Sequence, residues 1–421
     1  MLDIKFIREN PEKIKKACKD KGANVDIDKL LELDKKRREL IVQTEQMKAK
    51  RNELSKAVNL SNRRGENIDD GVKNQARELK EKVQNNEQEL KIIEKDFNDL
   101  MCQIPNPALD DVLVGKNDSQ NVAARKVGDL PKFDFQPKEH WEIGEKLDII
   151  DTERGAKVAG SRFYYFKGAA ALLEFALINL AMDTLTKKGF VPVIPPVMIK
   201  KEMAWAMGYL QQTDDEEAYY LEKDDLYLTA TSEQSLGAMH AGEIFEENVL
   251  PLRYIGFSTC FRREAGSYGK DTKGILRAHQ FDKIEMFVFC KPEDSEKEHQ
   301  ALLANEEELM QKLGLSYQVV NICTGDLGAP AAKKYDIEVW LPGQNRYRET
   351  HSTSNCTDFQ ARRLNIRYRD KHGKLNFVHT LNGTAFSMRP IIAILENFQQ
   401  KDGSVKIPKL LQKYLGFEKI K

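Results

Sequence analysis

The most constraining feature of this sequence is a heptad-like seam in residues 72–100. Positions 72, 76, 79, 83, 86, 90, 93, 97 and 100 carry Val, Ala, Leu, Val, Asn, Leu, Ile, Phe and Leu, so eight of nine are apolar. The alternating spacing of four and three places these side chains along one stripe of a helix and is typical of a coiled coil. Residues 72–100 are therefore expected to form a long helix that packs against a partner.

A weaker seam precedes this one in residues 33–58. Positions 33, 37, 40, 44, 47, 51, 54 and 58 carry Leu, Arg, Leu, Thr, Met, Arg, Leu and Val. Helix-breaking residues separate the two seams: Asn62, Gly65, Asn67, Asp69, Asp70 and Gly71. The pattern predicts two helices folded back as an antiparallel hairpin within residues 1–104, each of about 30 residues and roughly 45 Å long.

The function of this helical arm is open from the pattern alone. A coiled-coil hairpin can dimerise a chain or act as a spacer, and charge runs are often solvated helix faces. RNA binding is favoured by a basic cluster in the outer arm, formed by Lys48, Lys50, Arg51, Lys56, Arg63 and Arg64. The chain has 66 Lys plus Arg and 66 Asp plus Glu, so RNA binding would depend on such a local cluster.

Residues 105–135 and 136–421 differ from the arm and from each other. The first range contains Pro, Asn and Asp without periodicity and is predicted to be a linker. The second has a globular, aromatic composition, with an amphipathic helix near 168–188 and a final helix after Pro390. β-rich segments are expected near 190–199, 218–230, 254–264, 278–290, 316–322, 335–341 and 377–381. This order, without a G-x-G-x-x-G motif, predicts an α+β domain with a mostly antiparallel sheet.

Cysteine usage and hydropathy exclude several classes of protein. Six cysteines are scattered without a C-x-x-C pair, so we expect reduced thiols, a cytoplasmic location and no structural zinc. The apolar run from Ala169 to Met182 is interrupted by Glu174 and Asn179 and is shorter than a membrane span. The N-terminal residues lack the apolar core of a signal peptide. No membrane partner is expected.

Residues 254–290 concentrate groups that can bind substrates, and we expect them to form a β-hairpin. Side chains alternate along a strand, so Arg262 and Glu264 should share one face. Arg277, Phe281 and Glu285 should project together from the partner strand. Guanidinium groups, carboxylates and an aromatic ring suit a phosphate, an ammonium and a flat base. The alternative is a half-buried sheet with charges on its solvated face.

Three other segments carry polar groups. Thr231-Ser232-Glu233 opens a helix, where capping and a substrate role can coexist. Glu349 begins an oxygen-rich segment that suits Mg²⁺ or is a polar strand edge. Within it, His351 is the less favoured candidate for a general base, because phosphoryl chemistry needs charge stabilisation more than a base. Arg389 lies at a helix start, where its charge opposes the helix dipole, so we expect it to face a bound anion.

Taken in order, these segments resemble the class II aminoacyl-tRNA synthetases, and specifically the seryl-tRNA synthetase family, over essentially the full length. Residues 189–196 resemble motif 1, residues 261–285 motif 2 and residues 383–396 motif 3. In the family, motif 1 ends at a proline in the dimer interface, which implies this role for Pro196. The spacing from Thr384 to Arg389 is five, where many family members have six.

The resemblance also implies roles for the other site residues. ATP would be bound by Arg262, Glu264, Arg277, Ala278, Phe281, Glu349, Ser352 and Arg389. Three of these would be catalytic, namely Arg262, Glu349 and Arg389. The Mg²⁺ ligands would be Glu349 and Ser352. L-serine would be bound by Thr231, Glu233, Arg262, Glu285 and Thr384.

The implied activity is that of a serine–tRNA ligase. The serine carboxylate displaces pyrophosphate from ATP to give seryl-adenylate, and the terminal adenosine of tRNA(Ser) then accepts the serine. Charging of tRNA(Sec) stays open. The implied assembly is a homodimer whose arm grips tRNA. Two alternatives are an aminoacyl-carrier-protein ligase on the same catalytic fold and a non-catalytic RNA-binding paralogue.

Overall fold

A computed structural model describes residues 1–64, 70–210, 217–265, 269, 271 and 273–421, with the backbone alone at 61–64 and 73. The chain divides into two compact units. Residues 2–19 and 23–105 form one unit, which we call the arm. Met1 and residues 20–22 and 106–421 form the other, which we call the body.

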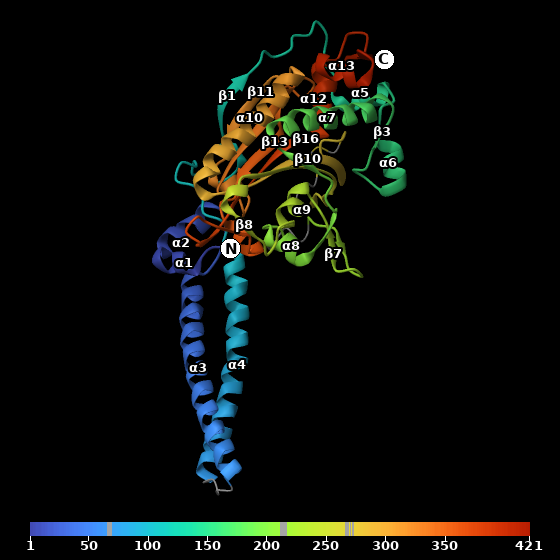
Figure 1. Ribbon diagram of the computed structural model, residues 1–421. Coiled ribbons are helices and arrows are strands. Elements are labelled where there is room, and N and C mark those ends of the chain that lie inside the picture. Colours follow the sequence, from blue (N-terminus) through green and yellow to red (C-terminus); the bar gives the residue numbers. More distant parts are fainter. Residues whose placement is uncertain (65–69, 211–216, 266–268, 270, 272) are drawn as a thin grey trace. The chain divides into compact units, whose positions relative to one another are not determined.

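Two long helices that lie side by side make up most of the arm (Figure 1). The arm helices are α1 (Ile4–Glu9), α2 (Pro11–Asp20), α3 (Ile27–Arg64) and α4 (Asp70–Gln103). Every predicted seam position of α4 is buried or partly buried. Arg37 Nε lies 3.3 Å from Glu94 Oε1, and Asn86 Nδ2 donates to Thr44 Oγ1 at 3.3 Å, so α3 and α4 run antiparallel. The predicted helical hairpin is confirmed.

The arm helices extend further into the predicted break than expected. Asn62 still belongs to α3, and Asp70 and Gly71 belong to α4. Such residues weaken a helix by only about 0.5–1 kcal/mol each, which helix pairing can offset. Gly65, Asn67 and Asp69 lie outside the described residues, as do the side chains of Arg63 and Arg64. Within the described part of the basic cluster, Lys48 pairs with Glu45 and Glu87, whereas Lys50 and Lys56 are exposed.

The body is built on an eight-stranded sheet with the order β1-β11-β12-β13-β16-β10-β9-β4. Neighbouring strands are antiparallel except for β4, which runs parallel to β9. The strands are β1 (Val122–Val127), β4 (Val191–Val193), β9 (Leu252–Phe261), β10 (Gln280–Cys290), β11 (Tyr317–Asn321), β12 (Lys333–Leu341), β13 (Arg346–Asn355) and β16 (His379–Ser387). The predicted α+β fold with a mostly antiparallel sheet is confirmed.

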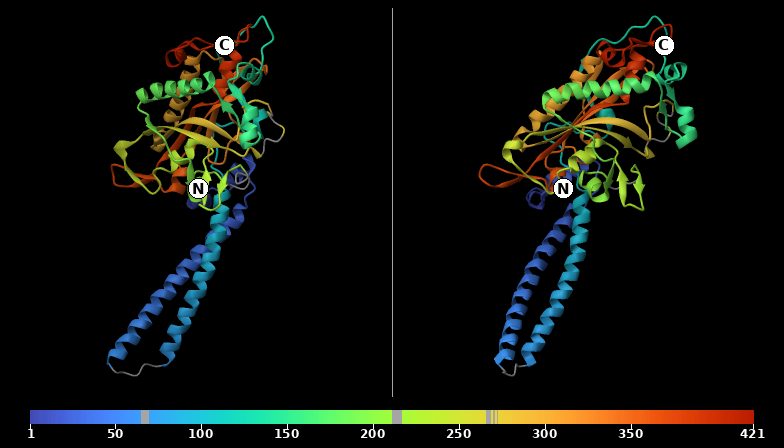
Figure 2. Two further views of the ribbon diagram at one scale, coloured as in Figure 1. Left: turned by 90° about the vertical axis from the view of Figure 1, so that its right-hand side faces the viewer. Right: turned by 45° about the vertical axis from the view of Figure 1, so that its right-hand side comes forward.

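Helices cover both faces of this sheet, and the alternation of β10 explains how. Met286 and Val288 belong to a core shared with α7 (Ala169–Leu185), α10 (Ser295–Leu313) and α12 (Arg389–Asn397). Phe287 and Phe289 face the other way and pack with α8 (Lys201–Ala206), α9 (Ser232–Ala238) and α11 (Phe359–Leu364). Figure 2 shows α7 and the group of α8 and α9 on opposite sides of the sheet.

Smaller elements complete the body. Two three-stranded sheets contain β5 (Met198–Lys200), β6 (Tyr220–Leu221) and β7 (Leu226–Leu228), and β8 (Ile244–Glu246), β14 (Arg367–Arg369) and β15 (Leu375–Phe377). Two strand pairs are β2 (Ile150–Asp151) with β3 (Tyr165–Phe166), and β17 (Val405–Lys406) with β18 (Lys419–Ile420). The further helices are α5 (His140–Lys146), α6 (Thr152–Ala159) and α13 (Lys409–Leu415). Short 3₁₀ turns are η1 (Asp118–Gln120), η2 (Thr186–Lys188), η4 (Glu247–Val249), η6 (Pro292–Asp294) and η7 (Thr324–Asp326).

Residues 105–135 are not the aperiodic linker that the sequence predicted. Strand β1 lies within this range and forms the edge of the main sheet by pairing with β11. Five of its six residues are exposed, so the strand has no alternation of apolar and polar residues to reveal it. The Asn106 side chain donates to the carbonyl oxygens of Pro330 and Cys356. The segment therefore belongs to the body.

The apolar helix is longer than the run seen in the sequence. Together, α7 and η2 form a helical segment of 20 residues, Ala169–Lys188, with a mean hydropathy of 1.4 in its most apolar window. By length and composition this segment could cross a bilayer. Its inner side chains, including Leu173, Leu177 and Leu180, are buried in the body core. A core helix passes the same test, so this is weak evidence for a membrane span.

Candidate active site

A small cavity, partly open to solvent, lies over the central strands of the body sheet. It brings together many of the predicted site residues. The lining residues are Arg262, Glu264, Leu276, Ala278, Phe281, Lys283, Glu349, Thr350, Ser352, Thr384, Ser387, Met388 and Arg389. Three predicted residues contact the lining without being part of it, namely Thr231, Arg277 and Glu285. Glu233 lies outside the lining and contacts Thr231 through its backbone nitrogen. Pro196 is exposed and lies outside the lining.

The predicted hairpin is shorter than expected, which changes how its charged residues are held. Strand β9 ends at Phe261 and β10 begins at Gln280, so Arg262, Glu264 and Arg277 do not project from paired strands. Glu264 has φ 54°, a left-handed conformation to which strand alternation does not apply. Phe281 and Glu285 do lie within β10, as predicted.

Arg262 and Phe281 form one wall of the cavity. The guanidinium carbon of Arg262 lies 5.1 Å from the centre of the Phe281 ring, a cation–π contact. Arg262 Nε donates to the Ala230 carbonyl oxygen at 3.2 Å, which fixes the side chain. Phe281 and Ala278 are buried in a cluster with Cys260 and Met388. The wall offers a flat apolar surface beside a fixed cation.

Arg277 is held by two carboxylates. Its Nη1 lies 3.2 Å from Glu264 Oε2, and its Nε lies 3.1 Å from Asp271 Oδ2. Asp271 also accepts from Arg348 Nη2 at 2.6 Å. Burial acts to raise the pKa of Asp271, but the Arg348 and Arg277 guanidiniums outweigh it and lower the pKa below its ordinary value. An anion that binds Arg277 must therefore compete with carboxylates already in place.

A β-bulge presents Glu349 to Arg389. The register of β12 and β13 pairs Ile337 with His351 and Glu338 with Glu349, so Thr350 is an extra residue. Arg389 Nη1 lies 3.1 Å from Glu349 Oε1 and donates to the Glu349 carbonyl oxygen at 2.9 Å. Partial loss of hydration in the cavity opposes ionisation of Glu349, but Arg389 and three further cations outweigh this and lower its pKa to about 2.

The oxygen donors near Glu349 fit a hard cation that takes most of its ligands from a substrate. The Glu349 side chain is 43% exposed and opens into the cavity. Ser352, also in the lining, adds a hydroxyl. Among the described residues no group of three or more His, Cys, Asp or Glu side chains could hold a metal alone. Mg²⁺ commonly binds one or two carboxylates together with phosphate oxygens, and this donor set fits that mode.

A buried polar cluster continues from the cavity. Lys283 Nζ lies 2.6 Å from Glu285 Oε2 and donates to Thr231 Oγ1 at 3.1 Å. Thr231 is also the N-cap of α9, accepting from the Glu233 backbone nitrogen at 3.3 Å. Burial raises the pKa of Glu285 to about 7, with Lys283 acting against it. Thr231 is thus both the predicted helix cap and a predicted site residue.

Glu233 is held at the inner end of this cluster. It accepts from Tyr209 Oη at 2.9 Å and from Gln360 Nε2 at 3.0 Å. Burial raises its pKa, while Lys283 and these hydrogen bonds oppose the rise. Three residues of this cluster were not predicted from the sequence, namely Lys283, Tyr209 and Gln360. Lys283 shares the strand parity of Phe281 and Glu285 and could have been found, whereas Tyr209 and Gln360 come from distant segments.

His351 does not have the contacts of a general base. It is buried, and burial lowers its pKa to about 4. Its Nε2 donates to the Ala385 carbonyl oxygen at 2.9 Å, and its Nδ1 accepts from the Thr350 hydroxyl at 2.8 Å. Both ring nitrogens are therefore occupied: Nε2 joins β13 to β16, and Nδ1 bonds a neighbour within β13.

The two units match two described protein families. Residues 1–108 match the seryl-tRNA synthetase N-terminal domain, and residues 218–398 match the tRNA synthetase class II core domain (G, H, P, S and T). The serine–tRNA ligase of Treponema denticola is 46% identical, with 100% of both chains covered. That of Thermobifida fusca is 47% identical over 99% of this chain and 98% of its own.

Solved structures agree with these matches. The seryl-tRNA synthetase from Pyrococcus horikoshii complexed with ATP has a TM-score of 0.92 and 42% identity, covering 100% of this chain and 99% of its own. The cytoplasmic serine-tRNA ligase from Naegleria fowleri in complex with AMP has a TM-score of 0.88 and 39% identity, with coverage of 100% and 99%. Full-length identity well above 30% leaves one conclusion: the chain belongs to the seryl-tRNA synthetase family of class II synthetases.

Proposed function

We propose that this chain is a serine–tRNA ligase that activates L-serine with ATP and transfers the serine to tRNA(Ser). The observation that carries this is the position of Arg262. Its side chain lines the open cavity beside Phe281, and its Nε donates to the carbonyl oxygen of Ala230, the residue before Thr231 in the buried cluster. The Arg262 guanidinium can thus lie between a bound amino acid and the α-phosphate of ATP that the amino acid attacks.

The open cavity is the proposed ATP site. Phe281 would stack on adenine, which adds about 0.5–1.5 kcal/mol beyond area burial. Glu264 and the backbone near Ala278 would bind the adenine edge. Arg277 and Arg389 would bind the terminal phosphates. Arg262 would stabilise the charge that develops as the serine carboxylate attacks phosphorus, so catalysis rests on positioning and electrostatics.

The buried cluster is the proposed serine pocket. Glu285 would take the substrate ammonium or hydroxyl, with Thr231, Glu233 and Thr384 around it. Three facing carboxyl groups, Glu233, Glu285 and Glu306, are buried beside a single lysine, Lys283. A pocket built to hydrogen-bond a hydroxyl can reject an analogue that lacks it by roughly 10⁴–10⁵. Alanine and glycine would then be rejected without editing.

Glu349 and Ser352 would hold Mg²⁺ together with ATP oxygens. The ion would supply charge neutralisation at the phosphates. The low pKa of Glu349 supports this role, because it keeps the carboxylate ionised at neutral pH, the form that binds a cation.

The arm and one face of the body would bind macromolecules. The arm would bind tRNA by its backbone and shape, and charging of tRNA(Sec) stays open. A second copy of the chain would cover an apolar face on α7 and β4 that ends near Pro196. Its exposed residues are Leu172, Phe175, Val191 and Ile194. Large exposed apolar side chains on adjoining elements favour an interface.

Separate observations argue against the two alternative functions. An aminoacyl-carrier-protein ligase needs no tRNA arm, whereas residues 1–108 match the seryl-tRNA synthetase N-terminal domain. A non-catalytic RNA-binding paralogue has no physical reason to keep Glu233, Glu285 and Lys283 buried together. A cytoplasmic location, expected from the scattered spacing of the six cysteines, stays a prediction.

ATP–pyrophosphate exchange measured without tRNA tests this proposal. We expect exchange with serine and none with threonine, alanine or glycine. Exchange with no amino acid at all would overturn the assignment and favour the RNA-binding paralogue. Charging of tRNA(Ser) by the same preparation would then identify the acceptor.

A further inference from the structure

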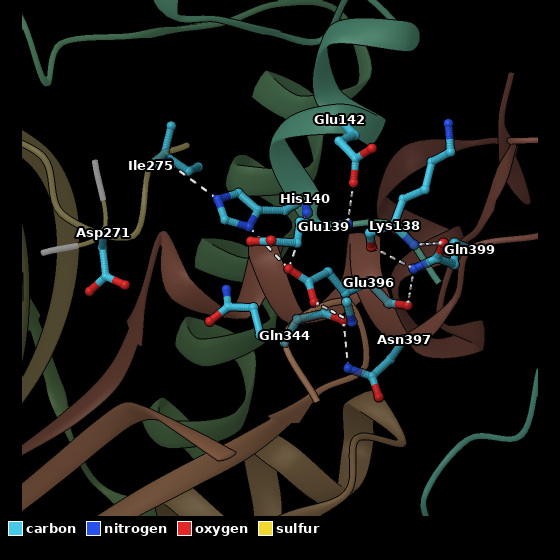
Figure 3. Close-up of polar contacts among 12 residues, drawn as sticks. Lys138, Glu139, His140, Glu142, Asp271, Ile275, Gln344, Glu396, Asn397 and Gln399 are labelled. Atoms are coloured by element: carbon cyan, nitrogen blue, oxygen red, sulfur yellow. Dashed lines mark hydrogen bonds and ion pairs between the residues drawn. The ribbon is translucent and has the colours of Figure 1, made fainter. Parts of the chain in front are cut away.

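A buried histidine lies outside the proposed substrate contacts but joins the two segments that carry the phosphate-binding arginines. His140, the first residue of α5, is 1% exposed, and its partner Glu396 in α12 is 0% exposed. Figure 3 shows His140 between Ile275 and Glu396. Ile275 lies two residues before Arg277, and Glu396 lies in the helix that begins at Arg389.

The contacts of the His140 ring fix its tautomer. The Ile275 backbone N–H donates to Nε2 at 3.3 Å, and a backbone N–H can only donate. Nε2 is therefore the acceptor, and Nδ1 carries the proton that is donated to Glu396 Oε1 at 3.0 Å. The neutral ring therefore accepts one hydrogen bond from the loop backbone and donates another to the Glu396 carboxylate in α12.

Glu396 is firmly placed by other donors. Its Oε1 also accepts from the His140 backbone N–H at 3.1 Å, and its Oε2 accepts from the Gly343 N–H at 3.0 Å. Gly343 lies in the turn between β12 and β13, the hairpin that carries Glu349. A buried carboxylate with three donors is a rigid anchor. The loop is fixed to this anchor through the ring.

The loop backbone comes unusually close to the ring. Gly274 has φ +75°, and a Cβ at this position would lie 2.1 Å from His140 Nε2. Only glycine allows this approach. The preceding residue, Lys273, places its ammonium 4.6 Å from the centre of the Trp141 ring, so α5 holds the loop at two adjacent points.

We propose that His140 is a positioning residue for ATP: its ring sets the place of Arg277 relative to Arg389 by tying the loop end to α12. This inference rests on the proposed function, since it concerns the same phosphate-binding arginines. His140 itself touches no substrate in this arrangement. Loss of the Ile275 contact should weaken ATP binding, because no other hydrogen bond among the described residues joins the ring to the loop backbone. Loss of the side-chain donor to Glu396 should mainly weaken the fold, because the His140 backbone N–H still donates to Glu396 and keeps residue 140 attached to α12.

Two substitutions separate these contacts. In His140→Asn the amide occupies the Nδ1 position, so the donor to Glu396 is kept and the acceptor for Ile275 is lost. In His140→Gln the amide reaches the Nε2 position, so the acceptor is kept and the donor to Glu396 is lost. Gln399→Ala is the matched control. Gln399 follows α12, exchanges two hydrogen bonds with the Lys138 backbone and donates to the Glu396 carbonyl oxygen, but it makes no hydrogen bond to the described residues of the loop.

Pyrophosphate exchange and melting temperature are measured for all four proteins. We expect H140N to raise the KM for ATP by about tenfold, the cost of one lost hydrogen bond, with kcat and the KM for serine nearly unchanged. H140Q and Q399A should lower the melting temperature and leave the KM for ATP within about threefold of wild type.

Equal KM values for ATP in H140N and H140Q would overturn the inference, as would an equal rise in the KM for serine. An inactive wild-type protein would instead overturn the proposed function, so the two failures are distinguishable.

Discussion

Thr384 lies directly opposite Glu285 on the ladder between β10 and β16, because Ala385 is an extra residue in β16. The register pairs Ile284 with Phe386 and Glu285 with Thr384. This bulge turns the Thr384 side chain toward the buried cluster, although the spacing to Arg389 is one residue shorter than in many family members. The register supports Thr384 as the proposed serine contact.

Serine activation should depend on the ionisation of Glu285. Burial raises the pKa of this carboxyl to about 7, so it is increasingly protonated as the pH falls below that value. If the carboxylate binds the substrate ammonium, kcat/KM for serine should fall about tenfold per pH unit below pH 7. Exchange at saturating ATP across this range measures the effect.

Two variants test the origin of this pH dependence. Glu285→Gln should lower kcat/KM by about a hundredfold and remove the inflection, since a charge-assisted hydrogen bond is lost. Asp282→Asn is the matched control, because Asp282 accepts from Thr259 Oγ1 at 2.7 Å. This variant should keep the inflection. A flat wild-type profile would contradict the prediction.

Glu306 should make the wild-type protein less stable as the pH rises. Burial beside Glu285 and Asp336 raises the pKa of Glu306 well above its ordinary value, so the folded protein holds a proton that the unfolded chain releases. The stability from this proton is complete below the unfolded pKa of 4.5 and is lost as the pH rises toward the folded pKa.

Glu306→Gln removes this dependence because an amide has no proton to lose. The melting temperature of E306Q relative to wild type should therefore rise between about pH 5 and pH 8, corresponding to at most ~1.4 kcal/mol per pH unit. Glu306→Ala should destabilise the protein at every pH by leaving a cavity. Parallel curves for E306Q and wild type would show that Glu306 is ionised in the folded state.

Removal of divalent metal should abolish exchange. Glu349→Gln should raise the Mg²⁺ concentration for half-maximal exchange by about tenfold, because a neutral amide is a poor ligand for a hard cation. Glu338→Gln is the control: Glu338 pairs with Glu349 across the ladder but accepts from Gln318 Nε2 at 2.6 Å. Full activity in chelator would rule out the metal role.

The apolar face on α7 and β4 should mediate dimerisation. Phe175→Glu combined with Ile194→Glu should give a monomer in sedimentation, because both side chains are already exposed, at 62% and 85%, and can change without disturbing the core. tRNA charging should fall by about tenfold or more if the partner subunit presents the tRNA. Val158→Glu, 70% exposed on α6, should stay dimeric. A monomer that charges tRNA at the wild-type rate would contradict this prediction.

Periodic segments were predictable, and segments without periodicity were not. The seam of α4 could be predicted because its buried residues all lie on one face of the helix and therefore recur at a regular spacing. Strand β13 was not predicted as a strand, since it reads Arg-Tyr-Arg-Glu-Thr-His-Ser-Thr-Ser-Asn and its burial comes from neighbours on both sides. Strand β1 gave no signal because it is an exposed edge.

The same distinction holds within the site. Phe281 and Glu285 could be placed together by strand parity, and Lys283 follows from the same rule. Glu264 and Arg277 needed tertiary information, since both lie in loops, 13 residues apart, and meet directly as an ion pair. Tyr209 reaches Glu233 from the loop after α8 and Gln360 reaches it from α11, and no local pattern relates them.

The two bulges limit how the chain can change in length. Thr350 and Ala385 are each an extra residue, in strands β13 and β16, and His351 joins the bulges through its bonds to both residues. Deleting either extra residue would restore a regular ladder but turn one part of the strand over, exchanging inward and outward side chains. Residues in the two bulged strands at this site can therefore be substituted singly. Insertions and deletions can be accommodated only in the loops beyond these strands.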